Sequence, residues 1–138
     1  MIGLDTNILL RWLIDPSIWP DDSPRQTAAV TALLADPARR FYVNFVVMSE
    51  ALWIIQRRLK QPKPVLLTAL DRLLNASNLV VQSRDAVEAA HRSFAEYRSG
   101  IHDRLIAETN VLAGCLWTAT FDGPASKTPG FRLLGTKG

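Results

Sequence analysis

The chain has 138 residues, of which 48% are hydrophobic and 21% are charged, and this composition excludes a dominantly disordered protein. Its length fits one domain over residues 1–138, which is large enough to bury a hydrophobic core without disulfide bonds or a structural metal. The single cysteine, Cys115, excludes an intramolecular disulfide, and no Cys/His cluster indicates a structural zinc site. The net charge of +3 is compatible with a polyanionic partner without establishing one.

No apolar run approaches the roughly 20 residues that cross a bilayer. Asp5 and Arg11 interrupt the apolar N-terminal segment, which therefore does not match a secretory signal. From these features we expect a cytoplasmic protein with no membrane association.

The first half of the chain is predicted to alternate short strands and helices. Ser23, Pro24 and Gln26 match a helix start with a capping box, and residues 41–47 are aromatic and β-branched, as in strands. The expected elements are a buried strand over 1–4, a helix over 8–14, a loop over 15–24, a helix from about 24 to 35, a strand over 41–47 and a helix from 49 to 59.

The second half continues the alternation. The expected elements are a helix over 65–74, a strand over 79–81, an amphipathic helix over 87–97, a helix over 101–113 that Gly114 ends, a strand over 116–121, a polar loop over 123–130 and a strand over 131–134. Strands separated by helices imply crossover connections and a parallel sheet with helices on both faces. The predicted fold class is therefore α/β.

Four of the thirteen acidic residues stand out from ordinary surface charge because they lie at predicted strand ends or helix starts. They are Asp5, Glu50, Asp103 and Asp122. At the carboxyl edge of a parallel sheet such residues converge, and two like charges about 4 Å apart repel by about 4 kcal/mol at an effective dielectric of 20. A hard divalent cation with oxygen ligands, Mg²⁺ or Mn²⁺, relieves that repulsion.

Three of these acids also have an ordinary structural interpretation. Asp5 fits a helix cap, Glu50 complements a helix dipole, and Asp122 starts a turn with Gly123. A metal site is favoured because all four acids occupy matching topological positions.

Four segments in order resemble the PIN domain nucleases, in particular the VapC-type toxins of toxin–antitoxin pairs. They are IGLDTNIL at 2–9, VVMSEALW at 46–53, IHDRLIA at 101–107 and TATFD at 118–122. The resemblance extends over essentially the whole chain. It implies a three-layer fold in which helices flank a short parallel sheet of about five strands.

The resemblance also implies an activity, namely metal-dependent hydrolysis of RNA phosphodiesters by an endoribonuclease. The four acids would be both catalytic residues and ligands of one or two Mg²⁺ ions, with Mn²⁺ as a substitute. The polar residues that would orient these carboxylates by hydrogen bonding are Thr6, Asn7 and Thr120. Two positions depart from the family pattern: His102, which fits either a surface residue or one that alters substrate approach, and Arg104, which directly follows the third acid.

The sequence also offers candidates for contacts with substrate and partners. Arg57, Arg58 and Arg104 are candidates for binding RNA phosphates, although the first two equally fit a solvated helix end. By resemblance, the partners are RNA, a cognate antitoxin, and a second copy in a homodimer or a toxin–antitoxin hetero-oligomer. An antitoxin arginine is expected in the acidic pocket, with apolar anchors at Ile18 and Trp19 or at Trp53.

Three other functions remain open at this point. The first is a PIN-type nuclease in RNA processing outside toxin–antitoxin systems, and the second is a catalytically inactive PIN-like binding module. The third, a phosphoacceptor receiver domain, is disfavoured because Thr6 and Asn7 replace its second acid and Lys137 lies in the tail.

Overall fold

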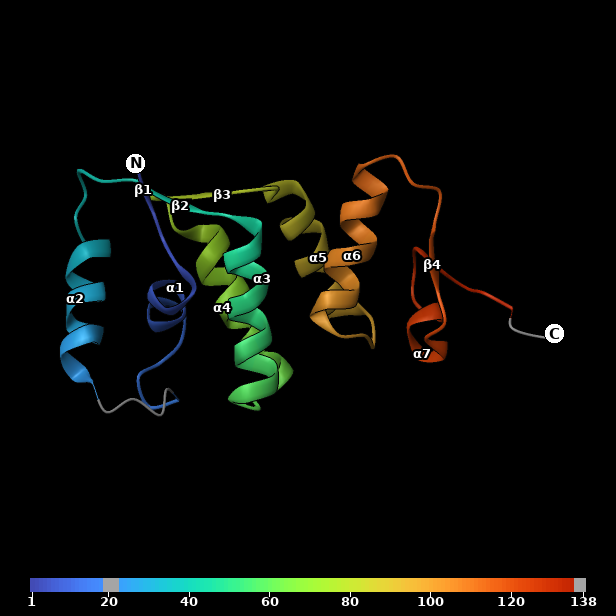
Figure 1. Cartoon of the computed structure of the whole chain (residues 1–138), viewed down its shortest axis with the longest axis horizontal. Coiled ribbons are helices and arrows are strands. Elements are labelled where there is room, and N and C mark those ends of the chain that lie inside the picture. Colours follow the sequence, from blue (N-terminus) through green and yellow to red (C-terminus); the bar gives the residue numbers. More distant parts are fainter. Residues whose placement is uncertain (19–22, 136–138) are drawn as a thin grey trace. The chain divides into compact units, whose positions relative to one another are not determined.

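The computed structural model describes residues 1–18 and 23–135. The chain divides into two compact units, unit 1 over Met1–Gln82 and unit 2 over Ser83–Gly138, and each is described by itself (Figure 1). Both contain parallel strands alternating with helices, so the predicted α/β class is confirmed. No helix in the described ranges has the length and apolar character needed to span a membrane.

Unit 1 is built on a three-stranded parallel sheet. Its central strand, β2 (Phe41–Val43), pairs with β1 (Ile2–Gly3) on one side and with β3 (Leu79–Val81) on the other. The helices are α1 (Thr6–Leu13), α2 (Pro24–Leu34), α3 (Phe45–Trp53) and α4 (Lys63–Asn75), and α1 packs against the other three. Phe41 and Val43 are fully buried, which places the core of unit 1 around β2.

The strand predicted over 41–47 is three residues long, Phe41–Val43. It ends at Val43 because Asn44 caps α3, its side chain accepting a hydrogen bond from the Val47 backbone N–H at 2.8 Å. The buried residues Met48 and Leu52 then follow helical spacing. This cap and this spacing override the strand preference of the aromatic and β-branched residues at 45–47, since strand preference depends strongly on context. Glu50 consequently lies in the second turn of α3 and not at its start.

Helix α3 continues directly into a π-helix, η1 (Ile54–Arg58). Its wider spacing is visible in the hydrogen bond from the Leu59 backbone N–H to the Ile54 carbonyl at 2.9 Å. Lys60, with φ of 51°, ends the segment in the left-handed region. The break predicted near residue 60 is therefore present.

Unit 2 combines a helical pair with a two-stranded parallel sheet. Helices α5 (Arg84–Glu96) and α6 (Ile101–Leu112) pack extensively against each other, and β4 (Thr118–Thr120) pairs with β5 (Phe131–Leu133). The segment 123–130, predicted as a loop, contains the one-turn helix α7 (Gly123–Ser126) because Asp122 caps it. Gly114 follows α6 with φ of 94°, as expected of a helix-ending glycine. The described strands thus number five, three in unit 1 and two in unit 2.

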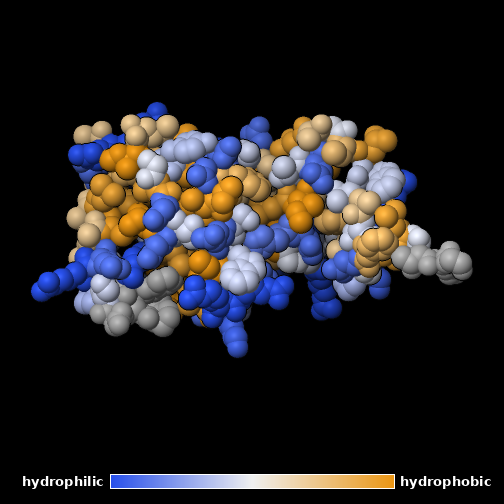
Figure 2. Space-filling view, viewed as in Figure 1, coloured by the Kyte–Doolittle hydropathy of each residue, from blue (hydrophilic) through white to orange (hydrophobic). Residues whose placement is uncertain are grey.

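The surface of unit 2 carries several large apolar side chains around its two-stranded sheet. Figure 2 shows hydrophobic side chains over the region of β4, and the exposed residues there include Leu116, Trp117, Phe121, Leu133 and Leu134. In unit 1 the exposed large apolar residues of α3 are Val46 and Trp53.

Candidate metal centre

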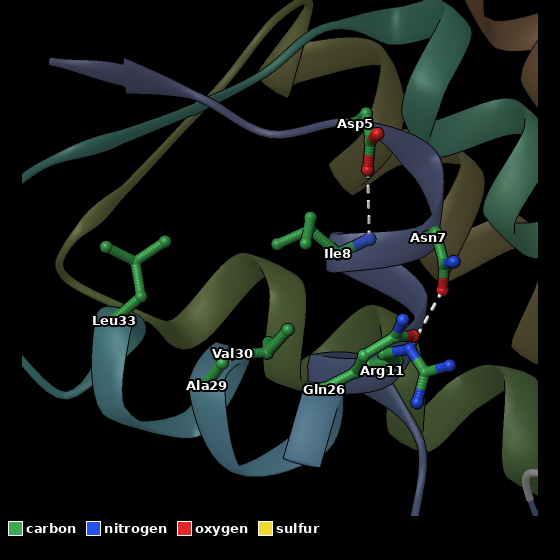
Figure 3. A pocket seen from close by; sticks show the side chains of 8 residues that line it. All are labelled: Asp5, Asn7, Ile8, Arg11, Gln26, Ala29, Val30 and Leu33. Atoms are coloured by element: carbon green, nitrogen blue, oxygen red, sulfur yellow. Dashed lines mark hydrogen bonds between the residues drawn. The ribbon is translucent and has the colours of Figure 1, made fainter. Parts of the chain in front are cut away.

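Asp5 lies in the short connection between β1 and α1 and caps α1. One residue, Leu4, separates it from the end of β1. Asp5 Oδ1 accepts a hydrogen bond from the Ile8 backbone N–H at 3.1 Å, and its carboxylate is exposed (Figure 3). The other oxygen, Oδ2, makes no hydrogen bond to any described residue. Because an ionised carboxylate has lone pairs on both oxygens, capping the helix leaves Asp5 able to bind a cation.

A cleft of about 350 Å³ opens beside Asp5, between α1 and α2 (Figure 3). Arg11 lies on one wall, where its Nε donates to Asn7 Oδ1 at 3.0 Å and its Nη1 donates to Thr27 Oγ1 at 3.1 Å. Asn7 therefore holds an arginine through its Oδ1, and its predicted role in orienting a carboxylate stays a prediction. The cleft is lined by Asp5, Asn7, Ile8, Arg11, Gln26, Ala29, Val30 and Leu33.

Glu50, the second acid, lies on α3, and α3 packs against the helix that Asp5 caps. Its side chain is exposed and makes no hydrogen bond or ion pair with a described residue. Val46 and Trp53, four residues before and three residues after it, lie on the same helix face and are 73% and 48% exposed. The carboxylate of Glu50 is thus flanked by two exposed apolar side chains.

The remaining two acids belong to unit 2. Asp103 is half-buried in the first turn of α6, and Asp122 is exposed in the short connection between β4 and α7. Asp122 repeats the arrangement of Asp5, because its Oδ1 caps α7 by accepting from the Ala125 backbone N–H at 3.0 Å. Thr120 Oγ1 accepts from the backbone N–H of Asp122 at 3.0 Å, so this bond holds the backbone of the fourth acid, and contact of Thr120 with a carboxylate stays a prediction.

The donor set fits a hard divalent cation. All four candidate side chains are carboxylates, and Asp5 and Asp122 each use one oxygen for a helix cap and keep the other. Within residues 1–18 and 23–135, no group of three or more His, Cys, Asp or Glu side chains is close enough to hold a metal ion. Each unit contributes two of the acids. Their convergence into one pocket stays a prediction.

A sequence model of the PIN domain matches residues 2–130 of the chain. The chain belongs to the PIN domain family. The match extends over both units and includes all four acids, whereas no curated protein sequence matches the chain. PIN domains are generally divalent-metal-dependent nucleases, so the family assigns a nuclease fold and agrees with the oxygen-only donor set.

Arg104 of this PIN domain is buried, which corrects its prediction as a residue that binds RNA. Its exposed fraction is 0%, its Nη2 donates to Thr128 Oγ1 at 2.7 Å and to the Pro129 carbonyl at 3.0 Å, and its guanidinium lies 5.4 Å from the Phe131 ring centre. Burial lowers its pKa, an effect that the negative charges of Glu108 and Asp103 oppose. A side chain without accessible surface does not contact a phosphate, so its role is structural.

A sequence signal for this burial exists. Ile101 and Ala107 lie three residues before and after Arg104 on the same helix face, and both are buried. An arginine in line with such apolar positions belongs to the buried stripe of α6.

The other basic candidates stay on the surface of the PIN domain. Arg57 and Arg58 are exposed in η1 and make no ion pair with a described residue, so they remain available to bind phosphate groups.

Two tryptophan rings, Trp12 and Trp117, each lie close to an arginine guanidinium. Arg72 lies 4.4 Å from the ring centre of Trp12, and Arg132 lies 5.1 Å from that of Trp117.

Proposed function

We propose that this PIN domain is a Mg²⁺-dependent endoribonuclease and acts as the toxin of a type II toxin–antitoxin pair. The observation that carries the nuclease part is the arrangement of Asp5 and Asp122 within the family match. Each follows a parallel strand, caps the next helix with one carboxylate oxygen and keeps the other oxygen for a ligand. Glu50 and Asp103 supply the remaining carboxylates.

The four acids would hold the metal, and a Mg²⁺ ion bound there would supply activation of water and stabilisation of the leaving oxygen of a phosphodiester. The helix caps of Asp5 and Asp122 hold these carboxylates in place before any ligand arrives. Glu50 has no partner in the described residues, so its side chain is available to reorient. Arg57 and Arg58 bind the flanking phosphates electrostatically.

The test is to incubate purified protein with total cellular RNA in Mg²⁺ or in EDTA and to map new RNA ends. We expect defined new ends in Mg²⁺ only. Asp5→Asn, Glu50→Gln and Asp103→Asn should each reduce the rate nearly as much as the triple variant, because an incomplete site does not function. Asp122→Asn should be milder. Losses that multiply would show independent contributions, and RNA binding without cleavage would show an inactive binding module.

The toxin part of the proposal is supported by the resemblance to VapC-type toxins and by the exposed face of α3. There Val46 and Trp53 flank the Glu50 carboxylate, which suits a protein partner that offers an apolar anchor beside a basic side chain. Ile18, the other proposed anchor, is half-buried in a small cavity with Pro64 and Val65. Trp19 lies outside the described residues.

Expression of the chain alone should therefore be toxic, and a small protein encoded beside it should relieve the toxicity. Trp53→Ala should weaken that relief while leaving RNA cleavage in vitro unchanged, because the truncation removes the apolar anchor and no carboxylate. Harmless expression of active protein in its own host, without an antitoxin, would contradict the toxin role and leave the nuclease intact.

A further inference from the structure

A continuous series of contacts joins the two acids of unit 2. Arg104 follows Asp103 in α6, and its Nη2 donates to Thr128 Oγ1 at 2.7 Å. The Thr128 hydroxyl donates to the Ala125 carbonyl at 2.6 Å, and the Ala125 backbone N–H donates to the Asp122 carboxylate at 3.0 Å. Arg104 is thus linked to the carboxylate of Asp122 through three hydrogen bonds, by way of Thr128 and Ala125.

Residues 128–130, which include the hydrogen-bond acceptors of Arg104, also contact α6 one turn further along the helix. The Pro129 carbonyl accepts a second hydrogen bond from Arg104 at 3.0 Å. Gly130 has φ of 90°, and a Cβ placed on it would lie 3.3 Å from the Cβ of Ala107. Because Arg104 and Ala107 share one face of α6, residues 128–130 are held against that face at two consecutive turns.

Stability alone does not explain an arginine at this position. Arg104 is fully buried, and its Nε and Nη1 have no hydrogen-bond partner among the described residues. Well-packed apolar side chains of similar volume often replace buried charged groups without loss of stability. The directional hydrogen bonds of the guanidinium, however, define the position of residues 128–130 in a way that an apolar side chain cannot.

We propose that Arg104 and Thr128 are positioning residues that set the Asp122 carboxylate relative to Asp103. This inference rests on the proposed function, in which both acids bind the metal. The contact series then determines the spacing of two ligands carried by separate elements, α6 and the β4–α7 junction. Outer residues that orient metal ligands typically affect metal affinity strongly.

The first experiment measures Mn²⁺ affinity of the full chain by calorimetry, without RNA. Thr128→Val removes the hydroxyl and should weaken Mn²⁺ binding by about 10-fold, whereas Thr128→Ser keeps the hydroxyl and should stay within about 2-fold of wild type. Ser126→Ala is the matched control. The Ser126 hydroxyl donates to the Gly123 carbonyl at 2.6 Å within α7, and neither group belongs to the series that links Arg104 to Asp122. Equal affinities of the Thr128→Val and Ser126→Ala variants would overturn the inference.

The second experiment is a double-mutant cycle with Asp122→Asn. If Thr128 acts through Asp122, Thr128→Val should cause no further loss of Mn²⁺ affinity in the Asp122→Asn background. Losses that multiply would show general damage and overturn the inference. Should thermal melting show that Thr128→Val does not fold, Arg104→Met takes its place in the same cycle.

A third measurement separates this inference from the proposed function. Hydrogen exchange of the Ala125 amide, followed by NMR without metal, reports on the hydrogen bond to Asp122. Thr128→Val should reduce its protection about 5-fold, the effect of losing one ordinary hydrogen bond. Wild-type protein that neither binds Mn²⁺ nor cleaves RNA would refute the metal site, whereas unchanged Ala125 protection in Thr128→Val would refute the positioning role.

Discussion

Asp5 has two roles that a pair of substitutions can separate, a helix cap and a proposed metal ligand. Asp5→Asn keeps a side-chain oxygen that can accept from the Ile8 backbone N–H, while Asp5→Ala removes the acceptor. Asparagine and aspartate are nearly equal as caps, and loss of a cap costs about 1 kcal/mol. The bond is single, exposed and 3.1 Å long, so this central value applies. Asp5→Asn should therefore leave the free energy of unfolding unchanged, and Asp5→Ala should lower it by about 1 kcal/mol.

The assay has a stability arm and an activity arm. Urea unfolding in EDTA measures the free energy without metal, and thermal melting should show Asp5→Ala about 3 °C below both wild type and Asp5→Asn. Mg²⁺-dependent RNA cleavage should be lost in both variants, because both remove the charged ligand. Asp15→Asn is the matched control, since Asp15 is another exposed carboxylate of unit 1 whose Oδ1 accepts from a backbone N–H, that of Ser17 at 2.8 Å, and the substitution should leave cleavage unchanged.

Two results would refute this reasoning. Wild-type cleavage by Asp5→Asn would show that Asp5 is not a metal ligand. Equal stability of Asp5→Ala and Asp5→Asn would show that the Ile8 hydrogen bond contributes nothing to folding.

Two further predictions concern backbone strain and substrate binding. Gly130→Ala and Gly114→Ala both place a side chain at positive φ, 90° and 94°, and each should lose about 1–2 kcal/mol of unfolding free energy. Gly130→Ala should lose more in urea unfolding, because only its new methyl group meets α6, at 3.3 Å, and equal losses would contradict this contact. Arg57→Ala and Arg58→Ala should each raise KM for RNA without changing kcat and should reduce the salt dependence of binding by about one phosphate contact. A change confined to kcat would exclude phosphate binding by these arginines.

Local chemistry made much of the fold predictable from the sequence. The α/β alternation, the glycine that follows α6 and the positions of Asp5 and Asp122 after strands all depend on signals within a few residues. The segment 41–47 shows where such signals conflict. Strand preference of its side chains competes with the Asn44 cap, and burial of the following helix face resolves the conflict in favour of the helix.

The sequence by itself indicated the family, the strand ends before Asp5 and Asp122, and the four candidate acids, because each depends on a short run of neighbouring residues. Only the tertiary structure showed which residues Arg104 contacts and that Trp53 remains on the surface. The partners of Arg104, Thr128 and Pro129, lie 24 and 25 residues away along the chain. Neither the type of a residue nor its immediate neighbours specify such a contact. It forms when packing brings the distant segment against the helix, and that packing also assigns the arginine its structural role.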